Sequence, residues 1–223
     1  MSSSTAQQSD YHLMKRRVVI TGVGMITPLG TGTKKSWNGL IEGHSAVKRI
    51  TNFDPEGYPC QVAAEVPDFE IDKFIELKEQ KKMDRFIHYG LAAASLAMED
   101  SGLTKNDSNA ERVGVSVGAG VGGLGSIENY SKILNEKGNR RVSPFFIPMT
   151  IINLASGHIS IRFGAKGPNL ALATACATGT HSIGESFKLI QSGVADAMIC
   201  GGAEAVITPL GIAGFASMKA LST

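Results

Sequence analysis

Short apolar runs alternate along the chain with longer stretches in which apolar residues recur at helical spacing. The runs that predict strands cover residues 17–21, 112–117, 169–173 and 195–200. The stretches that predict helices cover residues 33–42, 84–101, 126–137, 150–163, a segment that starts at 181, and 210–220. Strands that alternate with helices of this length form parallel sheets through right-handed crossovers, with helices on both faces. The pattern therefore predicts a layered α/β/α architecture with a mainly parallel sheet. No strand follows the last helix, so we expect this chain to hold an incomplete set of layers.

Two of the predicted helices have clear apolar faces. The face of the helix 84–101 consists of Ile87, Leu91, Ala94 and Met98. Gly102 follows at the position where a left-handed residue commonly ends a helix. In the helix that starts at 181, the apolar stripe consists of Ile183, Phe187, Ile190 and Val194. Gly193 is well placed to end that helix.

Composition and charge narrow the class of protein. The chain has 223 residues, 43% of them hydrophobic and 26 of them glycine, which suits a compact α/β protein with many tight turns. A net charge of +2 gives no overall support for nucleic-acid binding. No apolar run approaches the roughly 18 residues of a membrane span. Residues 1–14, rich in Ser and Gln at their start and without signal or transit features, are interpreted as a disordered leader before a domain at 15–223. Three widely spaced cysteines favour a reduced, cytoplasmic setting over a disulfide framework.

Cys176 is the candidate nucleophile. It follows the buried strand predicted at 169–173 and precedes a helix, with the small residues Ala175, Ala177 and Gly179 around it. Unpaired N–H groups and the helix dipole at such a junction favour the thiolate, the reactive form of cysteine. The alternative is a buried cysteine that acts as a small hydrophobe. No histidine is placed as an obvious base for this thiol, and no ligand cluster predicts a metal site.

The segment Gly118–Gly123 fits G-x-G-x-x-G after a strand and before a helix, as in dinucleotide sites. The acidic residue expected about 20 positions later is poorly supplied, because Glu136 lies in a helical stretch. The other interpretation is a tight turn with close packing of helix and strand. A nicotinamide-dependent oxidoreductase therefore stays an alternative function.

Basic and bulky apolar residues supply two further candidate surfaces. Lys78, Lys81 and Lys82 would share one face of a helix. Together with Arg140, Arg141 and Lys219, they could dock an acidic partner or be ordinary solvated charge. The segment 143–148 is core, the lining of an apolar pocket, or a subunit interface.

Five segments together resemble one family closely: residues 16–25, 118–125, 143–148, 174–179 and 201–204. The chain resembles the type II 3-oxoacyl-[acyl-carrier-protein] synthases, the β-ketoacyl synthases of fatty acid biosynthesis, from residue 14 to 223. The resemblance covers about the N-terminal half of such an enzyme. It implies the thiolase fold, two similar α/β halves stacked in five layers, and a homodimer.

The resemblance also implies a reaction without a cofactor. Cys176 would accept an acyl chain from acyl carrier protein, and malonyl carrier protein would lose CO₂ and attack the thioester, which lengthens the chain by two carbons. The backbone N–H of Cys176 would be one oxyanion donor. Residues implied near the acyl pocket are Val121, Phe146 and Phe215, with Phe146 near the dimer interface. Residues implied in carrier-protein docking are Lys78, Lys81, Lys82, Arg140, Arg141 and Lys219.

The family's two catalytic histidines, an accompanying lysine and its second oxyanion donor lie in the C-terminal half, which this sequence does not match. We therefore expect the chain alone to present Cys176 without completing elongation. A non-catalytic synthase-like subunit that binds acyl groups or the carrier protein is the other alternative.

Overall fold

The structure is a computed structural model that describes residues 16–104 and 109–222. The predicted leader at 1–14 lies outside the described residues. The elements of the first half are β1 (Ile26–Thr27), β2 (Gly30–Thr31), α2 (Thr33–Ile41), β3 (Lys48–Arg49), β4 (Val62–Ala63), η1 (Ile71–Lys73), α3 (Leu77–Gln80) and α4 (Arg85–Ser101). Those of the second half are η2 (Ala110–Arg112), β5 (Val113–Gly118), α5 (Leu124–Lys137), η3 (Asn139–Arg141), α6 (Phe146–Thr150), α7 (Leu154–Phe163), β6 (Asn169–Leu170), η4 (Ala175–Ala177), α8 (Thr178–Gln191), β7 (Ala197–Gly202) and α9 (Pro209–Ser217).

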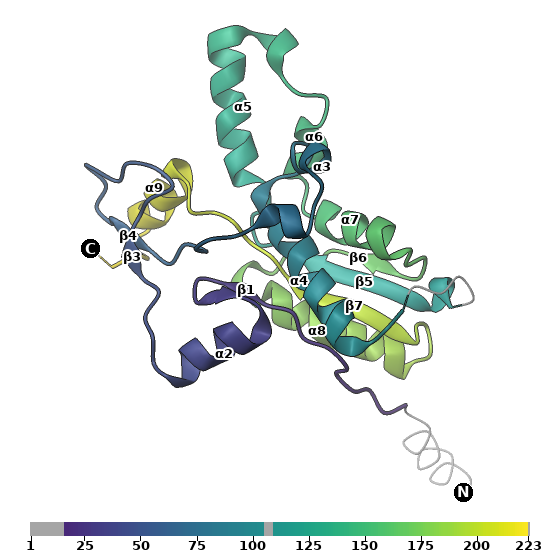
Figure 1. Cartoon of the computed structure of the whole chain (residues 1–223). Coiled ribbons are helices and arrows are strands. Elements are labelled where there is room, and N and C mark those ends of the chain that lie inside the picture. Colours follow the sequence, from purple (N-terminus) through teal and green to yellow (C-terminus); the bar gives the residue numbers. More distant parts are fainter. Residues whose placement is uncertain (1–15, 105–108, 223) are drawn as a thin grey trace, which may run out of the picture.

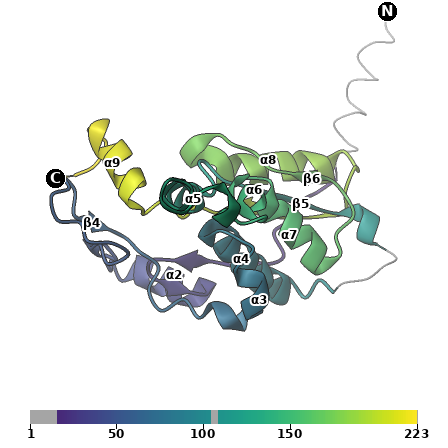
Figure 2. The same cartoon turned by 90° about the horizontal axis from the view of Figure 1, so that it is seen from above.

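The main sheet is parallel, with the strand order β6-β5-β7 (Figure 1). β5 and β7 pair along their whole length, from Val113 opposite Ala197 to Gly118 opposite Gly202. Helix α8 covers one face, while α4 and α7 cover the other (Figure 2). The core between sheet and helices contains the fully buried side chains of Phe86, Ile87 and Ile159. The predicted α/β/α layers and parallel pairing are confirmed. None of the helices in the described residues is long and apolar enough to span a bilayer.

Helix α4 begins and ends where the sequence predicts. The carboxylate of Asp84 accepts a hydrogen bond from the N–H of Phe86 (3.2 Å), which caps the helix. The same buried carboxylate accepts hydrogen bonds from the N–H (3.0 Å) and hydroxyl (2.6 Å) of Ser126. Gly102 ends the helix with φ 64°, in the left-handed region. Asp84 therefore fixes the start of α4 against the start of α5.

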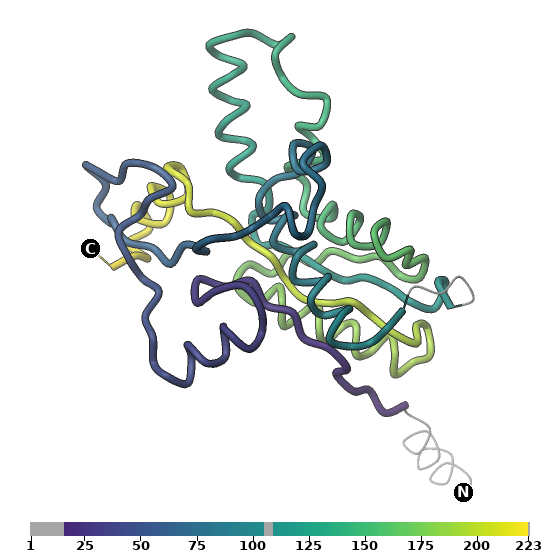
Figure 3. The backbone as a smooth tube through the Cα atoms, in the orientation of Figure 1, coloured from purple at the N-terminus to yellow at the C-terminus, as the bar shows by residue number. Residues whose placement is uncertain are grey.

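A second, smaller cluster lies away from the sheet. Ile50, Cys60 and Ile212 are buried together, so the ribbon β3–β4 packs against α9. The tube in Figure 3 shows the end of the chain beside this ribbon, while the N-terminal segment lies at the opposite side of the molecule. α5 stands out from the body between α9 and α6 (Figures 1 and 2).

The strand predicted at 17–21 is wrong, because this segment is extended but joins no sheet. Val19 and Ile20 are 67% and 80% exposed. The chain instead crosses α4 closely through Gly22 and Gly24, whose Cβ atoms would lie 2.3 and 1.9 Å from helix carbonyl oxygens. An apolar run favours a strand, but a strand also needs a neighbour for its N–H and C=O groups. Among the described residues, no strand pairs with the outer edge of β7.

The strand predicted at 169–173 is shorter than expected, and β6 ends at Leu170. The next ladder bond would join the N–H of Val117 to the carbonyl of Leu170. The hydroxyl of Ser156, on α7, lies between them: it accepts from Val117 (2.7 Å) and donates to Leu170 (2.6 Å). A side chain thus takes both ladder groups at the point where the strands separate.

Helix α8 presents an unexpected face to the sheet. Its buried residues are Thr178, Ser182 and Ser186. Ile183 and Phe187, from the predicted apolar stripe, are 49% and 42% exposed. Small side chains let the helix approach the sheet closely. The apolar stripe therefore lies on the outer face.

Candidate active site

Cys176 lies where the sequence places it, in the single turn η4 between β6 and α8. Its side chain is exposed, so the interpretation as a buried hydrophobe is wrong. That interpretation fits Cys60, which is buried and whose thiol lies 3.3 Å from the carbonyl of Val62. Cys200 is partly buried, and burial raises the pKa of its thiol. Of the three free thiols, Cys176 is the one that a substrate can reach.

Backbone geometry explains how Cys176 is presented. Ala175 has φ 49°, in the left-handed region of backbone conformation that residues other than glycine rarely adopt. The N–H of Thr174 donates to the hydroxyl of Thr178 (2.8 Å), and that of Ala177 donates to the carbonyl of Thr174 (3.0 Å). These bonds close a sharp turn from strand to helix. A strained residue inside such a turn persists where the surrounding contacts hold it, as at many active sites.

The glycine-rich segment Gly118–Gly123 lies directly beside this turn. A Cβ atom on Gly118 would lie 2.1 Å from the carbonyl oxygen of Leu172, and one on Gly120 would lie 3.3 Å from the Cα of Ala175. On the other side, a Cβ atom on Gly123 would lie 2.3 Å from the carbonyl oxygen of Met149 in α6. Glycine is required because three backbones meet without room for side chains.

Glu204 fills the position where a dinucleotide phosphate would bind. Its carboxylate accepts hydrogen bonds from the backbone N–H groups of Gly120 (2.8 Å), Val121 (2.8 Å) and Gly122 (3.1 Å). These amides are the donors that a phosphate would need. The internal carboxylate supports the tight-turn interpretation and removes the structural basis of the oxidoreductase alternative.

Glu204 is the site residue that sequence reasoning missed. The signal was an acidic residue two positions beyond the end of β7, next to a glycine-rich turn at the end of β5. Such a side chain meets the turn only if the two strands are neighbours, and their pairing was not assigned from the sequence.

Three histidines lie on the helices that flank the sheet. His88 is buried and His158 is half-buried, and burial lowers the pKa of both imidazoles. The Nδ1 atom of His181 lies 3.3 Å from the hydroxyl of Thr174, on the approach to the turn. Within the described part of the chain, the sulfur of Cys176 has no hydrogen-bond partner. Among the described residues, the site thus holds an exposed thiol that no imidazole contacts.

The three residues implied near the acyl pocket lie at different distances from the turn. Val121 follows Gly120, which lies against Ala175 of the turn, and its side chain is partly exposed. Phe146 begins α6 and packs on Tyr130 of α5, with ring centroids 5.3 Å apart. Phe215 lies on α9, on the other side of α5 (Figure 1). The structure brings Val121 to the turn and leaves Phe215 apart.

The basic residues form two groups and one isolated position. α3 ends at Gln80, so the expected helical face of three lysines is limited to one turn. Lys78 pairs with Glu76 (3.0 Å), and Lys82 pairs with Glu79 (2.7 Å) and lies over the ring of Phe145. The second group, at the far end of the α5 protrusion, consists of Arg140 and Arg141. Lys219 follows α9, across α5 from α3.

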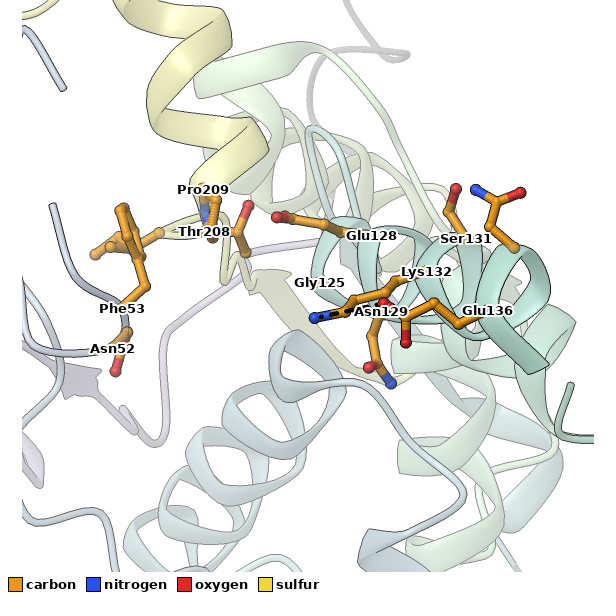
Figure 4. Close-up of a pocket in the computed structure, with 12 residues that line it drawn as sticks. Asn52, Phe53, Gly125, Glu128, Asn129, Ser131, Lys132, Glu136, Thr208 and Pro209 are labelled. Carbon is orange, nitrogen blue, oxygen red and sulfur yellow. Dashed lines mark ion pairs between the residues drawn. The ribbon is translucent and has the colours of Figure 1, made fainter. Parts of the chain in front are cut away.

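A cleft of about 690 Å³ lies between α5, the start of α9 and the loop at Asn52–Phe53 (Figure 4). Within it, Lys132 pairs with Glu136 (3.9 Å), and Glu128 accepts a hydrogen bond from the N–H of Leu210 (3.3 Å). None of the predicted site residues lines this cleft.

Comparison with known proteins places the chain in one family. The family profile "Beta-ketoacyl synthase, N-terminal domain" matches residues 15–223. The chain is 49% identical to 3-oxoacyl-[acyl-carrier-protein] synthase 2 of Vibrio cholerae over 211 residues, and 50% identical to that of Staphylococcus aureus (strain N315) over 208 residues. These matches cover 95% and 93% of this chain but 51% and 50% of the relatives, so the chain spans about half of their length.

Two solved structures share the fold. The ishigamide ketosynthase/chain length factor matches with a TM-score of 0.84 and 33% identity, over 93% of this chain and 52% of that one. A type II polyketide ketosynthase in complex with its acyl-carrier protein matches with a TM-score of 0.77 and 26% identity, over 92% and 55%. The layered α/β fold expected from the resemblance is thereby confirmed. The chain belongs to the β-ketoacyl synthase family.

Proposed function

We propose that this chain is the nucleophile-bearing half of a β-ketoacyl-[acyl-carrier-protein] synthase of fatty acid biosynthesis. The observation that carries the proposal is the exposed thiol of Cys176 on a strained strand-to-helix turn. Membership of the family and the identity of about 50% to named 3-oxoacyl-carrier-protein synthases support it. The three free cysteines support a reducing, cytoplasmic location.

The reaction has two steps. The sulfur of Cys176 attacks the carbonyl carbon of the acyl thioester on the carrier protein, and the carrier thiol leaves with the proton. In the second step, the bond between the malonyl carboxylate and its α-carbon breaks, CO₂ leaves, and the electron pair attacks the Cys176 thioester. The C–S bond then breaks and Cys176 returns as a thiolate. Its backbone N–H, in the turn η4 that leads into α8, is suited to stabilise the tetrahedral oxyanion.

The groups that handle protons in this reaction are proposed to come from outside the matched half. The described residues place no imidazole on the Cys176 sulfur, and the chain spans about half of its relatives. The outer face of α8, with Ile183 and Phe187 exposed, is the proposed packing surface for that other part. The exposed thiol of Cys176, on a turn closed by hydrogen bonds, favours a catalytic role over a purely non-catalytic subunit.

Acyl carrier protein and a second copy of the enzyme are the proposed partners. The basic groups around Lys81 and around Arg140 and Arg141 are suited to an acidic carrier protein. Homodimerisation of the full enzyme rests on the family resemblance. The exposed apolar side chains of Ile161 on α7 and Leu170 on β6 offer surface for such a contact.

Acyl transfer to Cys176 tests the proposal directly. We expect incubation with acyl carrier protein that carries an acyl thioester to transfer one acyl group to the chain and release the carrier thiol, with the added group mapped by peptide mass spectrometry to Cys176. The Cys176→Ala variant should stay unmodified, while the matched control Cys200→Ala should be acylated as the wild type is. A folded wild-type chain that stays unmodified, or an acyl group mapped to Cys60 or Cys200, would contradict the proposal.

A further inference from the structure

The carboxylate of Glu204 makes an unusual set of contacts for an exposed side chain. Three consecutive backbone N–H groups, from Gly120 to Gly122, donate to it at 2.8–3.1 Å. Successive amides that point to one spot form a concave anion site. Here the anion belongs to the chain itself. The contacts therefore link the end of β7 to the turn that follows β5.

This link continues to Cys176 through backbone contacts. The N–H of Ala203 donates to the carbonyl of Gly118 (3.0 Å), which extends the β5–β7 ladder up to the carboxylate. Gly120 lies against both Glu204 and Ala175: its Cβ would lie 3.0 Å from Oε2 of the first and 3.3 Å from the Cα of the second. Ala175 is the left-handed residue that precedes Cys176. Gly120 alone therefore separates the carboxylate of Glu204 from the strained turn at Ala175.

We propose that Glu204 is a positioning residue for the nucleophile, which holds the Gly120–Gly122 backbone against Ala175 and so keeps the Cys176 turn in its strained form. The inference rests on the proposed function in that Cys176 is taken as the nucleophile. Glu204 acts through the backbone, because its carboxylate contacts the glycine-rich turn rather than the sulfur of Cys176. It also fixes the Cα of Val121, on the wall of the proposed acyl pocket.

The hydrogen-bond pattern predicts a graded effect of substitution. Gly120 and Val121 both donate to Oε2, whereas Gly122 donates to Oε1. In Glu204→Gln, one amide oxygen can keep the first two bonds, while the NH₂ group faces the donor of Gly122. In Glu204→Ala, all three bonds are lost. We therefore expect the glutamine variant to retain most of the wild-type behaviour.

Amide hydrogen exchange of the 223-residue chain tests the inference. In Glu204→Ala, the amides of Thr174 and Ala177, which close the Cys176 turn, should exchange about tenfold faster than in the wild type. Glu204→Gln should raise their exchange by less. The control Glu136→Gln removes a charge from α5, where the carboxylate pairs with Lys132 rather than with the turn, and should leave the exchange unchanged. Faster exchange at Gly120–Gly122 with unchanged exchange at Thr174 and Ala177 would overturn the inference.

A second measurement covers the case in which Glu204→Ala does not fold. Gly120→Ala keeps the carboxylate but places a methyl group between it and Ala175, and it should also raise exchange at Thr174 and Ala177. Equal exchange in a folded Gly120→Ala chain would overturn the inference as well. Neither readout needs an acyl donor. Failure of acyl transfer in the wild type would therefore count against the proposed function alone.

Discussion

Replacement of Ser156 by alanine tests how the sheet is held next to the site. This hydroxyl is fully buried, on α7. It accepts from the N–H of Val117 and donates to the carbonyl of Leu170, at 2.7 and 2.6 Å. Beyond this point β6 leaves the sheet and leads into the Cys176 turn. Ser156→Ala removes one oxygen atom and leaves the two backbone groups without their partner.

The magnitude follows from the burial of those groups. Leaving a buried donor or acceptor unpaired costs about 1–3 kcal/mol. The N–H of Val117 lies in the core and bears the full cost, whereas Leu170 is partly exposed and its carbonyl can bind water. The cavity of one oxygen atom adds little. We therefore expect Ser156→Ala to lower the free energy of unfolding by about 2–3 kcal/mol.

Urea denaturation followed by circular dichroism measures this loss. Ser95→Ala is the matched control. The hydroxyl of Ser95, on α4, donates to the carbonyl of Leu91 one turn earlier in that helix (2.7 Å), so its removal leaves the strand pairing of β5 and β6 intact. The control should lie within about 0.5 kcal/mol of the wild type. A loss below about 1 kcal/mol in Ser156→Ala would show that Val117 and Leu170 close the gap and bond directly, which would refute the role assigned to the hydroxyl.

Three further predictions concern charged residues. Asp84→Ala should lower the free energy of unfolding by about 2–4 kcal/mol in the same assay, because it removes a helix cap and a buried acceptor; a loss below about 1 kcal/mol would contradict this. Hydrogen bonds from Arg112 and Arg16 lower the pKa of Asp196 from 3.8 to about 2. A depressed carboxyl pKa adds stability that is fully present above the unfolded value and is lost as the pH falls through the folded value. Asp196→Asn should therefore be less stable than the wild type at pH 6, and the two urea midpoints should converge as the pH falls from 3.8 to about 2. Lys81→Glu should weaken carrier-protein binding about two- to fivefold at low salt, and more than Lys78→Glu, since Lys78 already pairs with a neighbouring glutamate; equal effects in a binding titration would contradict the assignment.

The sequence predicts those features that depend on neighbours along the chain. The cap at Asp84 and the left-handed Gly102 are local, so both ends of α4 are correct. The turn at Cys176 is local too, because a short strand leads into it and a helix follows, although the strand expected to be buried is exposed at Asn169 and Leu170. The family resemblance adds the expectation that Cys176 is the nucleophile, which the pattern alone leaves open.

Features that depend on distant partners are not predicted. The helix expected at 150–163 begins only at Leu154, as α7, because the glycine-rich turn packs on the backbone before it and Gly123 donates to the carbonyl of Thr150 (3.2 Å). The apolar stripe of α8 is real, yet hydroxyl residues face the sheet and the stripe faces outward. Periodicity identifies an apolar face without identifying its partner.

The turn that presents Cys176 is held mainly by backbone contacts, so the side chains around it can be considered separately. Gly118 and Gly120 lie so close to Leu172 and Ala175 that a side chain on either would move the turn. Val121, between these fixed amides, has its N–H held by Glu204 while its side chain is 44% exposed. Substitution of this side chain changes an exposed surface and leaves in place the backbone hydrogen bonds to Glu204. We therefore predict that Val121, the residue proposed to line the acyl pocket, can be substituted without disturbing the presentation of Cys176.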